Sequence, residues 1–394
     1  MRKTINIGDL GTIITGKTPP TTNKNYYGDY AVFIKPTDIS EHSKYTYETE
    51  EMYSKLAAEK YESSLIPKGA ICVPCIGTVG TKMTMAPCDC YTNQSINSII
   101  CNENYDNEYV YYLIKNFLPG LKAYNLGTAS GREYVSKSNF EKIELVAEQD
   151  KEIQKKIGII LSRYDSLIEN YQKQIKLLEE AAQRLYKEWF IDLHFPEHEN
   201  TKIVDGVPEG WEKKSIGEIG EYLNGFAFKP SDWQDLGKPI IKIKEMGNGV
   251  TNETPRNSGE RVPAKYLIKT GDLLFSWSAT LMVIIWSGEE GWLNQHLFKV
   301  TPVKGIDREF LLQSISNTIV EFQNLTTGST MKHIQRNKLD QVFVNVPNAE
   351  IMKRYSDISE KTRTNILSLQ SQLRLLTEAR DRLLPKLMSG EITV

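Results

Sequence analysis

The sequence predicts an α+β protein in which two tandem globular modules are separated by two long helices that pack as an antiparallel coiled coil, giving an internal pseudo-twofold repeat. Two observations support this fold class. Two stretches, 150–190 and 349–384, carry apolar residues at the alternating three-and-four spacing of a long helix with one narrow seam. The segments that precede them also resemble each other, phrase by phrase and in the same order.

The first long helix is expected over residues 147–192. The stretch 150–190 contains no proline and a single glycine, Gly158. At ~1.5 Å per residue, roughly forty residues form a rod of about 60 Å, which is longer than an ordinary globular helix. Such a rod must bury its apolar seam against another surface. The seam is predicted to consist of Ile153, Ile157, Ile160, Leu167, Leu178 and Leu185.

The second long helix is expected within residues 347–394, which also include a C-terminal tail, and Pro385 is expected to stop it. The two helices align directly, Glu152 with Glu350 and Leu177 with Leu375. Two similar seams in one chain favour mutual packing as an antiparallel coiled coil. The alternative is two independent surface helices, each covering its own module. The second seam is predicted to consist of Ile351, Ile358, Leu369, Leu376 and Leu383.

The two modules are placed at residues 1–146 and 211–346, with a connector at 193–210 that is rich in proline and glycine. Short β-rich runs alternate with turn residues in both modules, which is typical of an α+β module. Matching phrases keep one order: FIKPTDIS with IIKIKEMG, IPKGAICV with IKTGDLLF, and TNQSINSI with LNQHLFKV. The sequence therefore indicates a tandem duplication.

Composition indicates an ordinary globular protein of the cytoplasm. The chain has 394 residues, 40% of them hydrophobic, and a formal net charge of −2. No run approaches the ~18 apolar residues of a membrane span, and the N-terminus lacks the apolar core of a signal peptide. The charge argues against a strongly basic nucleic-acid coat protein, although a local basic groove or partner subunits could still provide DNA binding.

Motifs for catalysis and metal binding are absent from the sequence. It has no Walker loop, no HExxH and no glycine fingerprint between a strand and a helix. Cys72, Cys75, Cys88 and Cys90 offer a CxxC followed by a CxC, but the second module has no cysteine at the matching place. Because neighbouring strand residues alternate faces, we expect free thiols here and no metal site. No catalytic residue is predicted.

Polar loops repeat in both modules and suit nucleic acid. Lys and Arg can neutralise phosphates, while Asn, Gln and Arg can form paired hydrogen bonds with base edges. The alternative for each loop is an exposed turn whose glycine serves backbone geometry. The candidate DNA-binding residues are Lys17, Thr18, Lys35, Thr37, Asp38, Gln94, Thr128 and Arg132 in the first module, and Lys229, Lys242, Lys244, Gln295, Ser329, Thr330, Lys332 and His333 in the second.

The whole chain resembles the specificity subunits of type I restriction–modification systems. The resemblance is carried by the module-plus-helix duplication, by FIKPTDIS and TTGSTMKHI, and most specifically by RLYKEWFIDLHFP and RLLPKLMSGEI. It implies two target-recognition domains that each read one half of a split double-stranded DNA site, with the helices as a spacer. It also implies docking of two methyltransferase subunits, which bind S-adenosylmethionine and methylate adenine, and through them of restriction subunits. No cofactor is expected in this chain itself.

Divergence between the modules predicts that the two half-sites differ, so that the DNA site is non-palindromic. Two other functions stay open at this point. One is a single-chain restriction enzyme with its own catalytic site, which the absent motifs argue against. The other is an adaptor that touches only protein, which would show no sequence preference even with partner subunits present.

Overall fold

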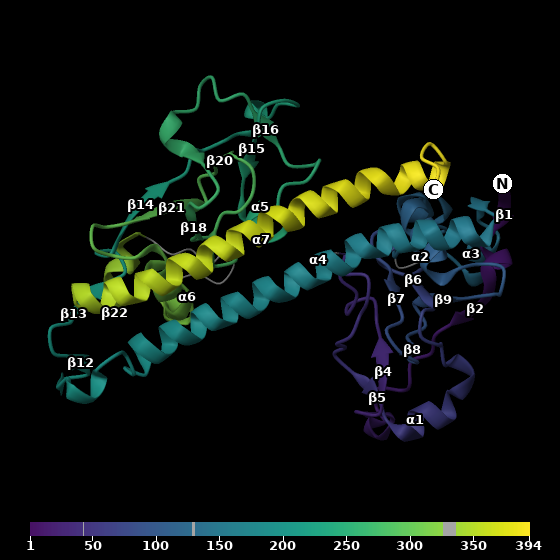
Figure 1. Ribbon diagram of the computed structural model, residues 1–394, viewed down its shortest axis with the longest axis horizontal. Helices are drawn as coiled ribbons and strands as arrows, with labels where there is room; N and C mark the ends of the chain where they lie inside the picture. The colour runs from purple at the N-terminus through teal and green to yellow at the C-terminus, as the bar shows by residue number, and fades with distance from the viewer. Residues whose placement is uncertain (42, 128–130, 326–335) are drawn as a thin grey trace. The chain divides into compact units, whose positions relative to one another are not determined.

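The computed structural model describes residues 1–41, 43–127, 131–325 and 336–394. It forms two compact units, and each contains part of both long helices (Figure 1). Unit 1 comprises Met1–Asn170 and Arg374–Val394, and unit 2 comprises Tyr171–Leu373. The long helices are α4 (Lys151–Tyr186, extended by a π-helical turn at Lys187–Ile191) and α7 (Ala349–Ser389). The α+β class with two modules and two long helices is confirmed. The module boundaries predicted along the chain stay a prediction, because the units are defined by contacts.

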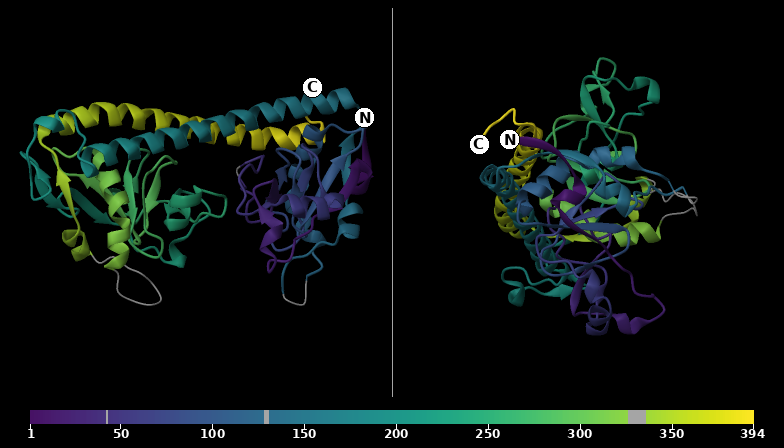
Figure 2. Two further views of the ribbon diagram at one scale, coloured as in Figure 1. Left: turned by 90° about the horizontal axis from the view of Figure 1, so that it is seen from below. Right: turned by 90° about the vertical axis from the view of Figure 1, so that its right-hand side faces the viewer.

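Unit 1 contains two four-stranded sheets and a two-stranded one, with the sheets on one side of the helix segments (Figure 2). The first four-stranded sheet is antiparallel, in the order β2-β9-β6-β7. The second, β3-β5-β4-β8, contains the parallel pair β4 and β8. The element bounds are β1 Arg2–Asn6, β2 Gly11–Thr15, β3 Tyr27–Gly28, β4 Ala31–Ile34, β5 Met52–Tyr53, α1 Lys55–Lys60, β6 Ile71–Pro74, β7 Thr84–Met85, β8 Tyr91–Thr92, β9 Ile96–Cys101, α2 Asn107–Phe117, α3 Lys137–Glu141 and β10 Glu144–Glu148.

Unit 2 repeats this arrangement. Its antiparallel sheet has the order β14-β21-β18-β19, and its mixed sheet, β16-β15-β20-β17, again contains one parallel pair, β15 and β20. The element bounds are β11 Ile203–Val204, β12 Val207–Pro208, β13 Glu212–Ser215, β14 Gly220–Asn224, β15 Lys238–Ile241, α5 Ile243–Asn248, β16 Arg256–Asn257, β17 Leu267–Ile268, β18 Leu273–Ser276, β19 Met282–Ile285, β20 Gly291–Leu293, β21 Leu297–Pro302, α6 Arg308–Asn324 and β22 Phe343–Val346. The shared topology confirms the internal repeat.

The two long helices run in opposite directions where they meet. In unit 1, Ile157 and Leu161 near the start of α4 share one apolar core with Leu384 and Leu387 near the end of α7. In unit 2 the order is reversed: the ring of Phe190, just beyond α4, lies 4.9 Å from that of Tyr355 in the second turn of α7. The antiparallel pairing is therefore built into the core of each unit.

The seam of each helix includes charged residues that the apolar pattern does not reveal. Leu167 and Ile358 are 43% and 44% exposed, so placing them in the buried seam was wrong. The buried residues next to them are Ile168 and Ser359, so the buried seam lies one residue further along at both places. Asp165 and Arg363 of the same helices are also buried, each in an ion pair, and a spacing that counts only apolar residues passes over them. The other predicted seam residues are buried or half-buried: Ile153, Ile157, Ile160, Leu178, Leu185, Ile351, Leu369, Leu376 and Leu383.

Pro385 does not stop the second helix, contrary to the prediction, because α7 continues through it to Ser389. A proline inside a helix costs about 3 kcal/mol, since it lacks a donor and crowds the preceding turn. Burial of Leu387 and Met388 in the core of unit 1 offsets that cost, at ~1.5–3 kcal/mol per side chain. The helix ends instead at Gly390, whose φ of +82° is the left-handed conformation typical of a residue just after a helix.

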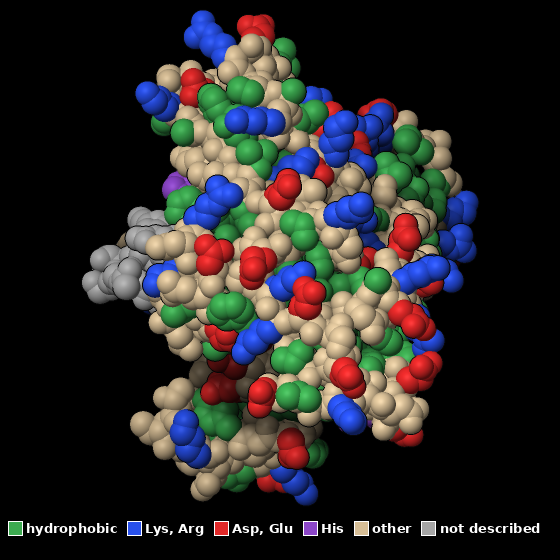
Figure 3. Space-filling model, turned by 90° about the vertical axis from the view of Figure 1, so that its left-hand side faces the viewer, with side chains coloured by type: hydrophobic (Ala, Val, Ile, Leu, Met, Phe, Trp, Pro, Cys, Tyr) green, Lys and Arg blue, Asp and Glu red, His purple; other side chains and the backbone are tan. Residues whose placement is uncertain are grey.

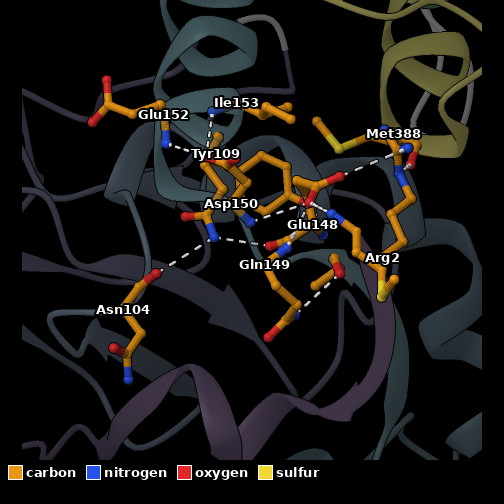
Figure 4. A network of polar contacts seen from close by, with 12 residues as sticks. Arg2, Asn104, Tyr109, Glu148, Gln149, Asp150, Glu152, Ile153 and Met388 are labelled. Carbon is orange, nitrogen blue, oxygen red and sulfur yellow. Dashed lines mark hydrogen bonds and ion pairs between the residues drawn. The ribbon is translucent and has the colours of Figure 1, made fainter.

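Polar contacts in unit 1 fasten the end of α7 to the first strand (Figure 4). The guanidinium of Arg2 donates to the carbonyls of Met388 (3.0 Å) and Leu387 (2.9 Å), where the helix leaves acceptors unpaired. Beside it the buried carboxylate of Glu148 accepts from the amides of Gln149 and Asp150. Burial alone would raise the pKa of Glu148, but the hydrogen bonds from the α-amino group and from these amides outweigh it and keep the pKa below its ordinary value. The start of α4 and the end of α7 are thus joined to one sheet.

Candidate nucleic-acid interface

In unit 1, strands β4 and β8 bring two of the predicted loops to one edge. The strands are parallel, with Ile34 opposite Thr92, so their carboxyl ends meet at the same edge of the sheet. Lys35 and Asn93 follow these ends directly, and the Asn93 amide donates to the Ile34 carbonyl at 3.1 Å. Two candidate loops that are far apart in sequence therefore lie side by side.

Unit 2 has the same edge at the same place. Ile241 of β15 lies opposite Leu293 of β20 in a parallel pair, and the Asn294 amide donates to the Ile241 carbonyl at 3.1 Å. Lys242, the N-cap of α5, and Asn294 consequently lie side by side at the carboxyl ends of these strands. Because the backbone contact recurs with equal length, the edge belongs to the shared frame of the two units.

A glycine brings a third loop against this edge in each unit. A Cβ atom on Gly16 would lie 2.1 Å from the Thr92 carbonyl oxygen, and one on Gly225 would lie 2.1 Å from that of Asn294. Any side chain would clash with backbone there, so the close approach explains why glycine stands at both positions. The contact places Lys17 and Thr18 beside the Asn93–Gln94 loop.

A fourth candidate loop of unit 1 is held by backbone contacts against the turn after β6, in the antiparallel sheet. The amide of Gly77 donates to the Glu133 carbonyl at 2.9 Å, and Ile76 forms a bridge with Tyr134. This contact places the exposed Arg132 next to the turn after β6. Thr128 of the same loop, and Ser329, Thr330, Lys332 and His333 of the matching loop in unit 2, lie outside the residues that the structure describes.

Several candidate side chains of unit 1 are already engaged by protein partners. The ammonium of Lys35 lies 2.7 Å from Glu50 and 3.3 Å from Glu51, and its side chain is only 18% exposed. The Thr18 hydroxyl is hydrogen-bonded to the amide oxygen of Gln94. Lys17 and Thr37 are exposed. On this edge, Lys17 and Thr37 are therefore the candidates most open to a ligand.

Asp38 has a structural role that the sequence pattern did not suggest. One carboxylate oxygen accepts from the Lys35 amide at 2.7 Å, and the other accepts from the Glu50 amide at 3.1 Å. Glu245, at the matching position of unit 2, accepts from the Lys242 amide at 3.1 Å. Asp38 thus holds the loop after β4 in shape, while Glu245 caps the first turn of α5, and a contact of Asp38 with DNA stays a prediction.

The matching residues of unit 2 have different partners. The ammonium of Lys242 lies 4.5 Å from the centre of the Trp233 ring, and Lys244 forms an exposed ion pair with Glu253 at 3.3 Å. Lys229 is exposed. Ala227 replaces the hydroxyl of Thr18, and the amide oxygen of Gln295 has no hydrogen-bond partner among the described residues. The same edge thus carries a different set of side chains.

Sequence reasoning missed Asn224 and His296 at the edge of unit 2. The indole of Trp277 donates to the Asn224 side chain at 3.2 Å, and its ring lies 5.7 Å from that of His296. The repeat could have indicated His296, because it follows the Asn-Gln pair that both modules contain. Nothing in the spacing indicates that Asn224 and Trp277 would meet, since 53 residues separate them.

The cysteines of unit 1 are free thiols. Cys72, Cys75 and Cys90 are buried, Cys101 is half-buried and Cys88 is exposed. Burial raises the pKa of Cys72 and of Cys75 to about 12, so both stay protonated near neutral pH. Within residues 1–41, 43–127, 131–325 and 336–394, no group of three or more His, Cys, Asp or Glu side chains could hold a metal ion.

The surface carries both signs of charge. On the face shown in Figure 3, Lys and Arg side chains are interspersed with Asp and Glu side chains. Mixed charge on this face agrees with the net charge of −2 and gives the face itself no broad electrostatic attraction to DNA. In the part of the chain that the structure covers, no helix is long and apolar enough to cross a membrane.

Comparisons with known proteins place the chain in a family. The family model described as "Type I restriction modification DNA specificity domain" matches residues 2–180 and 208–373. The MjaIX specificity subunit of Methanocaldococcus jannaschii is 26% identical over 408 residues, covering 98% of this chain and 93% of the relative. The HindI specificity subunit of Haemophilus influenzae is 38% identical over 165 residues, covering 40% of this chain and 35% of the relative.

A solved structure supports the fold. The crystal structure of the type I restriction–modification S subunit from M. genitalium matches with a TM-score of 0.57 at 16% identity, covering 98% of this chain and 96% of that one. The family match, the relatives and the fold agree. The chain therefore belongs to the specificity subunits of type I restriction–modification systems, the non-catalytic components that provide DNA recognition.

Proposed function

We propose that this chain recognises a bipartite, non-palindromic DNA site, with one half-site read by each unit. The observation that carries the proposal is the edge formed after β4 and β8 and repeated after β15 and β20. The backbone contacts at that edge are the same, while the side chains differ at equivalent positions. A shared frame with divergent side chains suits two readers of different base sequences.

The partners follow from this role. The chain recruits two methyltransferase subunits, which bind S-adenosylmethionine and methylate adenine, and through these it takes part in restriction, all in the cytoplasm. Near-neutral charge supports a need for partners, because counterion release from phosphates supplies much of the affinity for DNA. The two equivalent units would offer two similar surfaces to two identical subunits.

The long helices act as the spacer between the half-sites. The limits of the two units fall inside both helices, after Asn170 in α4 and after Leu373 in α7, so each helix is continuous from one unit into the other. A continuous helix resists bending far better than a loop does. Helix length would therefore set the number of base pairs between the half-sites, as subunit geometry does in dimeric DNA readers.

The direct test is single-molecule mapping of N6-methyladenine in DNA from cells that carry this protein and its methyltransferase partner, compared with cells that lack this protein. We expect a bipartite motif with a fixed gap that disappears in the deletion. A motif that persists without the protein would contradict the proposal. If the purified complex also bound unrelated duplexes equally well, the chain would instead be an adaptor that touches only protein.

A module exchange tests the assignment of half-sites. Replacing residues 1–145 with the corresponding module of another specificity subunit should change one half of the methylated motif and leave the other half and the gap intact. A change in both halves, or in neither, would contradict the division of recognition between the units.

A further inference from the structure

Unit 2 presents an aromatic ring and an ammonium together at its recognition edge. Trp233 is 48% exposed, and the Lys242 ammonium lies 4.5 Å from the centre of its ring. Lys242 directly follows β15 and adjoins the Asn294–Gln295 loop, so the pair belongs to the edge described above. One exposed ring alone marks nothing, but apolar side chains that are exposed together can mark a binding surface.

The exposure of Trp233 does not come from a loose loop. The Gln234 amide donates to the Arg256 carbonyl at 2.9 Å, and the side chain of Asn257 donates to the Asp232 carbonyl at 2.7 Å. Leu236, on the same loop, is 82% exposed. A loop tied at several points presents its apolar side chains in a fixed position, which lowers the entropy lost on binding.

The residues of unit 1 that match Trp233 and Lys242 are arranged differently. Each ring follows a single 3-10 turn, Trp233 after Pro230–Asp232 and Tyr27 after Lys24–Tyr26. Tyr27, however, is half-buried, and its hydroxyl donates to the Pro19 carbonyl at 2.8 Å. The matching ammonium, that of Lys35, is held by two carboxylates.

We propose that Trp233 and Lys242 form a DNA contact peculiar to unit 2, in which Lys242 binds a phosphate and Trp233 packs against the adjoining nucleoside. The inference rests on the proposed function and deepens it. An ammonium beside an exposed ring matches the alternation of phosphate charge and apolar sugar or base along a strand. Lys242 can turn from the ring to a phosphate at little cost, because exposed cation–π contacts are weak.

The test measures binding of the full-length chain, assembled with its methyltransferase subunits, to a duplex that contains the methylated motif and to an unrelated duplex. Trp233→Ala should weaken binding roughly 5- to 100-fold. Trp233→Phe keeps an aromatic face and should lose less DNA-binding affinity than Trp233→Ala. Lys242→Met should reduce the slope of log K against log salt by about 0.9, the value for one phosphate contact.

One lysine variant serves as a control. Lys304→Met removes an exposed lysine from the turn between β21 and α6. It should leave the salt slope unchanged. Circular dichroism melting of each variant checks that the fold is intact.

Wild-type affinity and salt slope in both Trp233→Ala and Lys242→Met would overturn the inference. So would normal DNA binding together with reduced recovery of methyltransferase subunits, because the surface would then dock protein. Failure of the proposed function would give a different result, because the wild-type complex would then bind both duplexes equally. The affinity and salt slope of Trp233→Ala and Lys242→Met, compared with those of the wild type, would still test the contact.

Discussion

Unit 1 and unit 2 each bury an ion pair formed by an arginine of α7, and the partners of the two arginines differ. In unit 1, Asp165 of α4 pairs with Arg380 of α7 at 2.6 Å and accepts from the Tyr112 hydroxyl at 2.5 Å. In unit 2, Arg363 of α7 donates to both carboxylate oxygens of Glu309, at 2.8 and 2.9 Å. All four charged side chains are less than 10% exposed.

The repeat aligns Asp165 with Arg363, so equivalent positions carry opposite charges. The same alignment places Ala182 opposite Arg380. Apolar positions have kept the frame common to both units, whereas the buried charges have diverged. Each unit therefore requires its own helix segments. If the helix segment of one unit replaced that of the other, a buried charge would be left unpaired, which is strongly unfavourable.

Natural reporters separate the two units experimentally. All six tryptophans lie between Trp189 and Trp292, in unit 2, and all five cysteines lie between Cys72 and Cys101, in unit 1. Tryptophan fluorescence therefore follows the unfolding of unit 2, and alkylation of the buried thiols follows the opening of unit 1.

The largest expected effect comes from Arg363→Met. It leaves the buried Glu309 carboxylate without its two charged donors, which should destabilise unit 2 by about 3–5 kcal/mol. Denaturant unfolding followed by tryptophan fluorescence measures the loss, while thiol protection in unit 1 should stay as in the wild type. Restoration of stability by Glu309→Leu in the same chain would confirm the cause. An unchanged midpoint would show that the pair is not buried in solution.

Arg380→Met should destabilise unit 1 by a smaller amount, about 2–3 kcal/mol, because Asp165 loses a single close contact and keeps the hydroxyl of Tyr112. Faster alkylation of the buried cysteines is the measurement. The fluorescence midpoint of unit 2 serves as the internal control. If fluorescence shifted as much as thiol exposure, the two units would unfold together and the comparison would fail.

Two buried tyrosines, Tyr112 in unit 1 and Tyr355 in unit 2, also differ in their hydrogen bonds. Tyr112→Phe removes a donor to a buried carboxylate and should cost unit 1 about 1.5–3 kcal/mol. Tyr355→Phe removes a buried hydroxyl that has no partner among the described residues, so unit 2 should be unchanged or stabilised by up to about 1–3 kcal/mol. Thiol alkylation measures the change in stability of unit 1, and tryptophan fluorescence measures the change in unit 2. Opposite signs are expected, and a loss in both variants would contradict the assignment of Tyr355.

The smallest effect concerns the thiols themselves and needs no mutation. At pH 8 and without denaturant, iodoacetamide should label Cys88 first, because only that thiol is exposed. Burial raises the pKa of Cys72 and Cys75 to about 12, so their reactive thiolates form mainly above pH 11 in the folded chain. Peptide mass mapping over time gives the order. Early labelling of Cys72 would indicate that unit 1 opens readily.

Much of the fold followed from the sequence. The alternating spacing predicted the long helices, and the ordered phrase matches predicted the repeat, because backbone hydrogen bonding and apolar burial impose periodicities that one chain displays. The repeat also located the loops of the candidate site. Gly16 and Gly225 stand at matching positions, where any side chain would clash with the backbone of the neighbouring loop. The prediction of the buried seam was wrong at Leu167 and Ile358, and the prediction that Pro385 ends the helix was also wrong. At these places tertiary contacts outweigh the local sequence rules.

The sequence by itself determined the duplicated α+β frame and the family resemblance, because these depend on patterns read along the chain. Only the tertiary structure decided which side chains of the edge are open to a ligand. Lys35 and Lys242 are equivalent in sequence, yet one is held by Glu50 and Glu51 and the other lies over Trp233. The physical reason is that charge neutralisation and burial depend on neighbours brought together by folding, and no spacing rule encodes those neighbours.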